Sequence, residues 1–509
     1  MALGFPSPLW TKNSLAVGRA NVPDVPVEDF RKSCIAICSQ GGRLAALCPL
    51  PEASRDLKKT PQLLAVFADD ARGSVGLLTA RLPDSRRYPA LSTELPQAQA
   101  FERELFEDHG IRPEEHPWLK PLRRHPDLES YSLKGEVSGN PYPFFRVEGP
   151  GIHEVAVGPV HAGIIEPGHF RLQCRGEAVL HLEVQLGYQH RGAEALFLGS
   201  PPARRLAVAE SIAGDTSVGH VLAHCMVVEA LARVEAPLYA QAVRGIALEL
   251  ERLSNHVGDL GALCNDIGHL PGASWFGRLR GEFLNLLMEL SGNRFGRGLV
   301  QPGGIRFGLS AEQRGDFLTR LAVAERDLQD TARVAFNSPT VGSRFEQTGV
   351  ATREAAETLG LVGPAARASG CDRDVRRDHP FGIYRFAHIP VALVESGDVM
   401  ARALVRWLET QRSMTFLREQ LNELPRESLS TAITGSAPDS LAVSMVEGWR
   451  GEIVHLAVTS GDGNIAGYKI VDPSFHNWFG LAVAMRGNQV SDFPLCNKSF
   501  NLSYAGHDL

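Results

Sequence analysis

Two short stretches of this chain, far apart in the sequence, share one spacing and constrain its fold more than any other feature. Near its end the chain reads Asp-Pro-Ser-Phe-His-Asn, in which Ser474 and Asn477 lie three residues apart. An Asp-Pro turn followed by such a pair aims two side chains at one point, where cysteines would hold a soft metal. Far upstream, in Ile-Ala-Gly-Asp-Thr-Ser, Ala213 and Thr216 have the same spacing. Neither pair offers a thiolate.

The composition excludes several classes of protein. The chain has 52 Lys and Arg residues against 58 Asp and Glu residues, and this mild acidity argues against a nucleic-acid partner. Its eight cysteines contain no Cys-x-x-Cys pair, which argues against a disulfide framework and against an iron–sulfur or zinc site built from this chain alone. No apolar stretch approaches the roughly 20 residues that cross a bilayer, so we expect no direct transmembrane span.

Turn residues and apolar runs predict an α+β protein with two domains. Short apolar runs separated by turns predict strands in the first domain, and a helix is expected at residues 98–109, closed by Gly110. The expected segments are an irregular arm (1–28), a small α/β-sandwich-like domain (29–124), a linker (125–150) and a larger domain (151–509).

The larger domain is expected to begin with strands and continue with helices. Strand-like runs lie at residues 154–157, 170–174 and 178–185, and Arg-Gly-Glu between the last two predicts an antiparallel hairpin. Apolar periodicity then predicts a mainly α-helical region, and strand character returns near residues 451–458.

Several motifs carry a resemblance to a known family. Residues 158–171 and 186–194, together with the two spaced pairs, resemble the large subunit of membrane-bound [NiFe] hydrogenases of the formate hydrogenlyase type. Residues 367–384 resemble its relative, the quinone-site (49-kDa-type) subunit of respiratory complex I. Residues 101–111 resemble the end of the 30-kDa-type subunit of complex I, which implies a fusion of the two subunits. In the hydrogenases both pairs read Cys-x-x-Cys and hold nickel and iron; this chain keeps both frames and none of the four ligands.

The resemblance implies where a site would lie. It brings the loop of Glu166 and the side chain of Arg450 to the vacant nickel–iron positions. Alanine, threonine, serine and asparagine cannot hold a soft nickel–iron centre, so we expect no metal and no cofactor bound by this chain itself. The alternative interpretation is a cavity refilled by a hydrogen-bonded plug. The residues expected to line the cavity are Glu166, Ala213, Thr216, Ser474 and Asn477.

The second chemistry that the family implies is quinone reduction. In the quinone-site relative, a histidine on the first hairpin and a tyrosine at a helix start form the hydrogen-bonding pair. His161 and His169 both lie in the matching hairpin stretch, and the equivalence stays open between them. No tyrosine occurs between Tyr188 and Tyr239, so the tyrosine half is missing.

A third candidate is a polar chain of acids and histidines at helical spacing, which can relay protons towards a membrane partner or form salt bridges. Its members are Asp215, His220, His224, Glu229, Glu249 and Glu251. The residues expected to carry chemistry are His161, His169, Asp215 and Arg450.

Together these features favour a peripheral subunit on the cytoplasmic side of a membrane, part of a complex I-like or hydrogenase-like oxidoreductase that passes electrons to quinone or another acceptor and couples this to proton translocation. The resemblance implies several partners: a small iron–sulfur subunit carrying the cluster, a ferredoxin-like subunit, and antiporter-like and anchor subunits of a membrane arm. A non-catalytic coupling subunit and a working [NiFe] hydrogenase large subunit are the alternatives.

Overall fold

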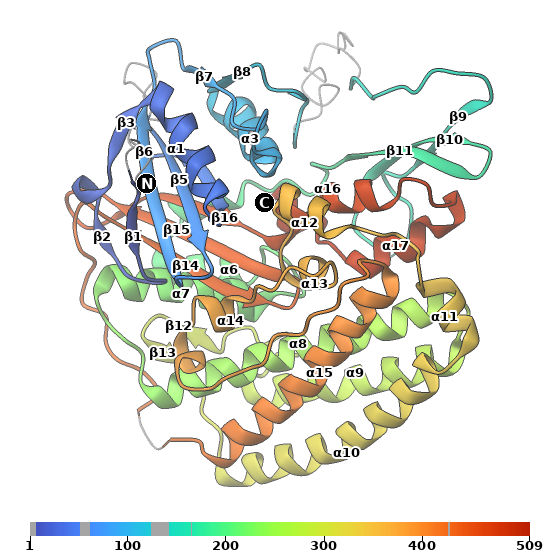
Figure 1. Ribbon diagram of the computed structural model, residues 1–509. Coiled ribbons are helices and arrows are strands. Elements are labelled where there is room, and N and C mark those ends of the chain that lie inside the picture. Colours follow the sequence, from blue (N-terminus) through green and yellow to red (C-terminus); the bar gives the residue numbers. More distant parts are fainter. Residues whose placement is uncertain (1–6, 51–61, 124–141, 164, 426–427) are drawn as a thin grey trace, which may run out of the picture.

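The computed structural model describes residues 7–50, 62–123, 142–163, 165–425 and 428–509. It is an α+β protein with helices and mostly antiparallel strands, as the sequence predicts (Figure 1). Most of the expected linker, residues 125–150, lies outside the described part, and residues 142–150 have no regular structure. Among the described residues, no helix has both the length and the apolar character needed to cross a membrane.

The N-terminal domain is a five-stranded sheet covered by helices. Four of its strands are joined in the order β1-β6-β5-β4, and β3 pairs in parallel with β6. The bounds are β1 (Leu9–Thr11), β3 (Asp24–Pro26), β4 (Arg43–Pro49), β5 (Gln62–Asp69), β6 (Ser74–Arg81), α1 (Val27–Ser39) and α3 (Gln99–His109), with the small pair β7 (Arg87–Pro89) and β8 (Arg112–Glu114). Helix α3 ends at Gly110, whose left-handed φ of 62° confirms the predicted C-terminal cap.

The expected irregular arm contains three short strands. β1 and β3 complete the N-terminal sheet, whereas β2 (Val17–Gly18) pairs with β14 (Ser440–Gly448) of the larger domain. Strands of two or three residues are too short to show an alternating pattern in the sequence. Their partner strands also lie far away in the chain, so no local hairpin signal marks them. The arm therefore ties the two domains together.

The second sheet is buried on both faces. Its order is β16-β15-β14-β2, with β15 (Gly451–Thr459) and β16 (Ile465–Val471) antiparallel to their neighbours. Every residue of β14 and β15 is buried, since α7 (Ser217–Ala232) packs against one face and parts of the N-terminal domain approach the other. A sheet covered on both faces has continuous apolar runs instead of alternation.

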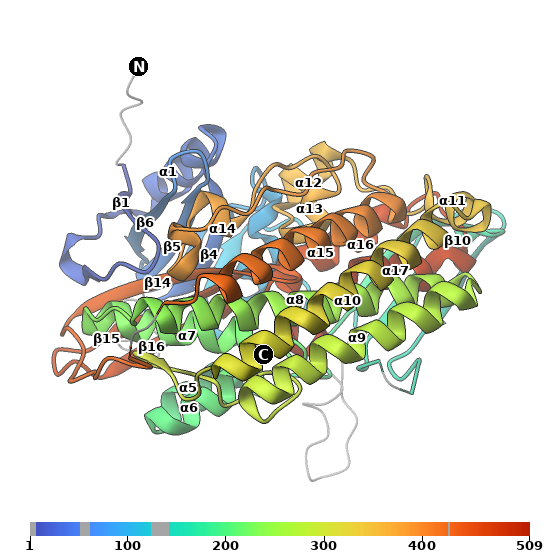
Figure 2. The ribbon, with the colours of Figure 1, turned by 90° about the horizontal axis from the view of Figure 1, so that it is seen from below.

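Long helices form the layer on the far side of α7 (Figure 2). Helix α8 lies at the centre of this layer, between α9 and α15, and nearly all of its side chains are buried. Polar caps set several helix starts: Ser310 and Gln313 form a capping box on α10, and Asp398 caps α15. The bounds are α8 (Leu238–Asp266), α9 (Leu270–Ser291), α10 (Ala311–Phe336), α11 (Pro339–Phe345) and α15 (Val399–Asn422).

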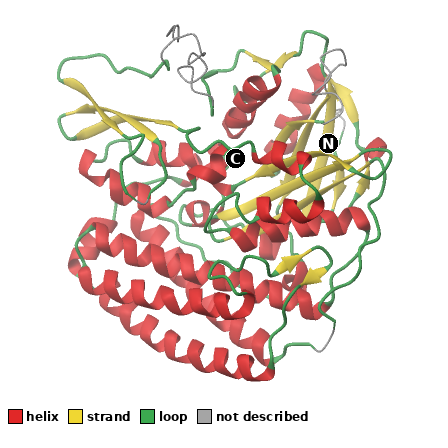
Figure 3. Ribbon diagram, turned by 180° about the vertical axis from the view of Figure 1, so that it is seen from behind, coloured by secondary structure: helices red, strands yellow, loops and turns green. Residues whose placement is uncertain are grey.

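The predicted hairpin is confirmed and projects from the body of the molecule (Figure 3). Strands β9 (Ile152–Val157), β10 (His169–Arg175) and β11 (Ala178–Gln185) form an antiparallel sheet in the order β11-β10-β9. The remaining elements of the described residues include four short 3-10 helices, and the others are α5 (Ala193–Gly199), α6 (Pro202–Ala209), β12 (Val300–Gln301), β13 (Gly304–Ile305), α12 (Arg353–Leu359), α13 (Gly363–Arg367), α14 (Val375–Asp378), α16 (Pro473–Ala484), α17 (Phe493–Phe500) and α18 (Tyr504–Asp508).

Candidate functional site: the four ligand positions and their surroundings

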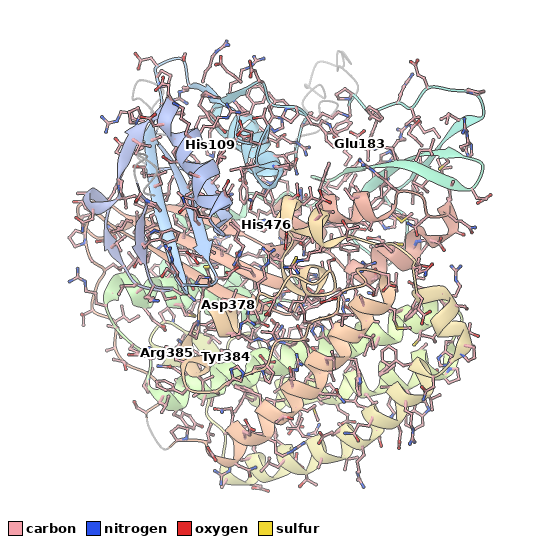
Figure 4. The ribbon with its side chains drawn as sticks, in the orientation of Figure 1. His109, Glu183, Asp378, Tyr384, Arg385 and His476 are labelled. Atoms are coloured by element: carbon pink, nitrogen blue, oxygen red, sulfur yellow. The ribbon has the colours of Figure 1, made fainter. Side chains whose placement is uncertain are left out.

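The two spaced pairs both lie at helix starts. Thr216 is the N-cap residue of α7, and Asp472 is the N-cap residue of α16. The Asp472 carboxylate accepts a hydrogen bond from the Ser474 backbone N–H at 2.7 Å, which fixes the direction of the Asp-Pro turn. The first turn of α16 also carries His476 (Figure 4). Its ring packs edge-on against Phe101 of α3, with 5.5 Å between the ring centroids. The N-terminal domain thus covers the start of α16.

Arg450 lies over the α7 pair, as the resemblance implies. Its guanidinium forms two bonds to the Asp215 carboxylate, of 2.5 and 2.8 Å, and donates to the Thr216 hydroxyl at 3.1 Å. It also stacks on the Trp449 ring at 3.9 Å from the centroid. Burial alone would raise the pKa of Asp215, but Arg450 outweighs it and lowers the pKa, so this carboxylate stays ionised.

The four positions form no open coordination site. The Ser474 hydroxyl accepts a hydrogen bond from the Ser503 N–H at 2.8 Å, and the Asn477 amide clamps the backbone of Val362 through bonds of 2.9 and 3.0 Å. Thr216 accepts from Trp449 and Arg450, and Ala213 is fully buried. Each polar group at these positions is therefore already engaged with the protein.

Glu166 and His161 lie next to the C-terminal helix α18, whereas His169 does not. Glu166 accepts from the Ala505 N–H at 3.1 Å. His161 faces Tyr504, with 3.4 Å between Nε2 and the hydroxyl oxygen. His169 lies on β10 with Arg171 near its Nε2, so the structure separates the two histidines that the sequence left equivalent.

Tyr504 is a residue that the sequence analysis missed. It packs edge-on against Trp478 at 4.8 Å between centroids, and burial raises the pKa of its hydroxyl to about 12. It lies 343 positions from His161, on a five-residue helix, so no spacing in the sequence could have indicated the pair.

The expected relay of six residues is not one chain in the structure. Glu229 pairs with Arg244, and Glu249 pairs with Arg252 and Arg376. Glu251 instead caps α7 by accepting from the Val218 and Gly219 N–H groups, and burial raises the pKa of this carboxyl to about 8. Glu229 and Glu249 therefore form ion pairs, the alternative that the sequence left open, because residues on one helix face different neighbouring elements. His220 and His224 contact another set of partners: Asp472 and Tyr468.

A cavity of about 820 Å³ lies elsewhere, between the arm, α7 and α8. It is lined by Tyr384 and Arg385 (Figure 4) and by none of the four ligand positions or the hairpin histidines.

Comparison with known proteins identifies the family. Residues 266–439 match the family described as "Respiratory-chain NADH dehydrogenase, 49 Kd subunit". Hydrogenase-4 component G of Escherichia coli (strain K12) is 30% identical over 443 residues, which cover 84% of this chain and 76% of that protein. The chain belongs to the family of membrane-bound hydrogenase and complex I 49-kDa-type subunits. Formate hydrogenlyase subunit 5 of the same organism is 30% identical over 83% of this chain and 77% of its own length. An NADH-quinone oxidoreductase subunit of Chloroherpeton thalassium is 28% identical over 66% of this chain and 82% of its own length.

The residues at the ligand positions of this family member do not fit a nickel–iron centre. Such a centre prefers soft thiolates, whereas the side chains here are a methyl group, two hydroxyls and an amide, all of which face protein partners. Among the described residues, no group of three or more His, Cys, Asp or Glu side chains has the geometry of a metal site.

Proposed function

We propose that this chain is a nickel-free large subunit of a membrane-associated respiratory oxidoreductase complex. The proposal rests on the hydrogen bonding at the four ligand positions. The polar groups of Thr216, Ser474 and Asn477 all form hydrogen bonds with other protein groups. The named relatives are components or subunits of larger hydrogenase and NADH-quinone oxidoreductase enzymes. We therefore expect this chain to act only in assembly with partners.

The proposed place of the chain is peripheral, on the cytoplasmic side of a membrane arm. An iron–sulfur subunit would deliver electrons, and antiporter-like and anchor subunits would carry the coupled proton. The N-terminal domain would act as the equivalent of a separate 30-kDa-type subunit. Its attachment through β2 and through Arg43, which pairs with Glu452 of β15, supports joint action of the two domains.

We further propose that electrons pass to a quinone or another acceptor near His161 and Tyr504. The pair combines an imidazole, which can both donate and accept a hydrogen bond, with a phenol that stays protonated at neutral pH. A reduced acceptor needs protons as well as electrons, and two such groups within reach of one another can supply them. Tyr504 thus takes the role of the tyrosine that is missing from the start of α7.

Replacing Tyr504 by phenylalanine is expected to lower quinone-dependent turnover of the intact complex on the order of 10²-fold, because general acid catalysis contributes about this much. H161Q should have a similar effect, and the double variant should lose little more, since the two groups act together. The exposed His153 of β9 provides the matched control, because H153Q removes an imidazole from the strand that precedes the loop of His161. Unchanged turnover in Y504F and H161Q would leave the non-catalytic coupling subunit as the better interpretation.

Elemental analysis of the complex tests the nickel-free proposal directly. We expect iron from the partner's clusters and no nickel above background, in cells supplied with nickel. Near-stoichiometric nickel that is lost in a variant of Ser474 or Asn477 would overturn the proposal and favour the hydrogenase alternative.

A further inference from the structure

A continuous hydrogen-bonded chain of five side chains runs beneath the second sheet. Nε2 of His220 lies 3.0 Å from the Asp472 carboxylate, and Nδ1 of His220 lies 3.1 Å from Nε2 of His455. Nδ1 of His455 lies 2.8 Å from the Tyr468 hydroxyl, which is also 2.9 Å from Nδ1 of His224. The chain connects α16, α7, β15 and β16, so it is built by tertiary contacts.

For a neutral His220 beside an ionised Asp472, the hydrogen-bonding partners define one direction for every proton in these five side chains. Asp472, when ionised, can only accept, so Nε2 of His220 carries the proton and Nδ1 of the neutral ring accepts. His455 must then donate from Nε2 and accept at Nδ1 from the Tyr468 hydroxyl. The Tyr468 oxygen in turn accepts from Nδ1 of His224. All four donors point towards the carboxylate.

We propose that these five side chains conduct a proton between Asp472, beside the ligand positions, and His224, beside α5 and α6. A proton that binds Nε2 of His224 displaces the Nδ1 proton to the Tyr468 oxygen, whose own proton moves to Nδ1 of His455. His455 then passes its Nε2 proton to Nδ1 of His220, and His220 passes its Nε2 proton to Asp472. One proton enters, no electron moves, and only the charge of Asp472 changes.

Burial suits the chain to this task. Asp472, His220, His455 and His224 are at most 2% exposed, and Tyr468 is 7% exposed, so the five side chains are shielded from bulk solvent. A cavity of about 240 Å³ is lined by Tyr468 and other residues of strand β16. Tyr468 is the member of the hydrogen-bonded chain next to His224.

The charges around the chain favour its resting state. Burial opposes ionisation of Asp472, but His220 and Arg450 outweigh it and lower the carboxyl pKa. Burial lowers the pKa of His455 well below its usual value and that of His224 to about 3, so both imidazoles rest neutral. Burial also raises the pKa of Tyr468. The neighbouring titratable or charged groups are Asp215, Arg450 and His476 near Asp472, and Arg205, Cys225 and Glu194 near the other end.

Replacing Asp472 by asparagine should reverse the histidine tautomers of these five side chains without a change of pH. Oδ1 of Asp472 accepts from Ser474, and Oδ2 faces His220. In D472N the amide oxygen can keep the bond to Ser474 while the NH₂ group donates to Nε2 of His220, as a protonated carboxyl would. His220 must then donate from Nδ1, and the reversal should reach His224.

The test is ¹⁵N NMR of the protein labelled with ¹⁵N-histidine and purified with its unlabelled partners at neutral pH. Single His→Gln variants assign the histidine resonances. We expect Nε2 protonation of His220 and His455 and Nδ1 protonation of His224 in the wild type, and reversal of all three tautomers in D472N. In D472N/Y468F, His220 should stay reversed and His224 should no longer follow, because the linking hydroxyl is gone. D398N, an equivalent N-cap change on α15, should leave all three tautomers unchanged.

Two outcomes would overturn the proposal: a wild-type tautomer order that differs from the expected one, or a reversal in D472N that stops at His220. The conducting role rests on the proposed function, which requires proton movement. The NMR test needs neither nickel nor an acceptor, so its failure would leave the results for Tyr504 and for nickel standing, and the converse also holds.

Discussion

Replacing Arg367 by methionine is expected to lower the free energy of unfolding by about 3–5 kcal/mol, the cost of leaving buried charges without their partner. Arg367 is fully buried and pairs with Glu409 at 2.6 Å, Glu447 at 2.8 Å and Asp374 at 3.5 Å. Methionine fills much of the volume but supplies no charge. Asp374 keeps its ion pair with Arg376 and Glu409 keeps His256, so the loss falls mainly on Glu447, which must stay ionised without its cation or bind a proton. Denaturation in guanidinium chloride, followed by circular dichroism, measures the effect.

A second substitution shows whether charge is the cause. Burial raises the pKa of Glu447 to about 7 even though Arg367 opposes this rise, so Glu447 is the carboxyl that should be most costly to ionise once Arg367 is removed. R367M/E447Q should therefore recover part of the lost stability. R353M, which removes the exposed pair of Arg353 with Glu357, should leave the denaturation midpoint unchanged. A loss in R367M that E447Q does not reduce would indicate a packing defect instead.

The sequence predicted those parts of the fold whose signals are local. The turn residues Arg-Gly-Glu mark the hairpin of β10 and β11, and Gly110 marks the end of α3 directly after its last periodic residue. Helix α10 (Ala311–Phe336) lies in the region where periodicity predicts helices, and a local capping box marks its start. The placement of Arg450 over the α7 pair followed from the family resemblance, and the structure agrees.

The chemistry between distant elements could not be predicted from spacing. Tyr468 and His224 are 244 positions apart, and His220 and Asp472 are 252 apart. Each of these residues lies in an apolar run, where a single polar side chain is typical of a satisfied core residue as well as of a functional one. The helical positions of Glu229 and Glu249 were visible in the sequence. Glu229, however, pairs with Arg244 of the next helix, and Glu249 pairs with Arg376 of a distant segment as well as with Arg252 of its own helix. A pattern along one element shows which residues share a face, and only the fold shows what that face meets.

The junction of the two domains should depend on pH through Glu104. This buried carboxylate of α3 pairs with Lys469 of β16 at 2.7 Å and with Arg123. Burial alone would raise its pKa, but the two cations outweigh burial and lower the pKa from 4.5 to about 2. Since the folded pKa lies below the unfolded one, the stabilisation is complete above pH 4.5 and is lost as the pH falls towards 2. The difference corresponds to about 3 kcal/mol.

K469M is therefore expected to destabilise the protein at pH 7 and to reduce the further loss of stability between pH 5 and pH 3. With one cation gone, the pKa of Glu104 should move back towards its ordinary value, so less stabilisation remains for acid to remove. Denaturation midpoints measured at pH 7, 5 and 3 give the comparison, and K32M, which removes an exposed lysine next to Asp29, provides the control. Equal acid dependence in K469M and wild type would mean that other carboxylates govern the acid response. In that case the junction would be held mainly by apolar packing of Phe101 against Phe475, whose ring centroids are 5.0 Å apart.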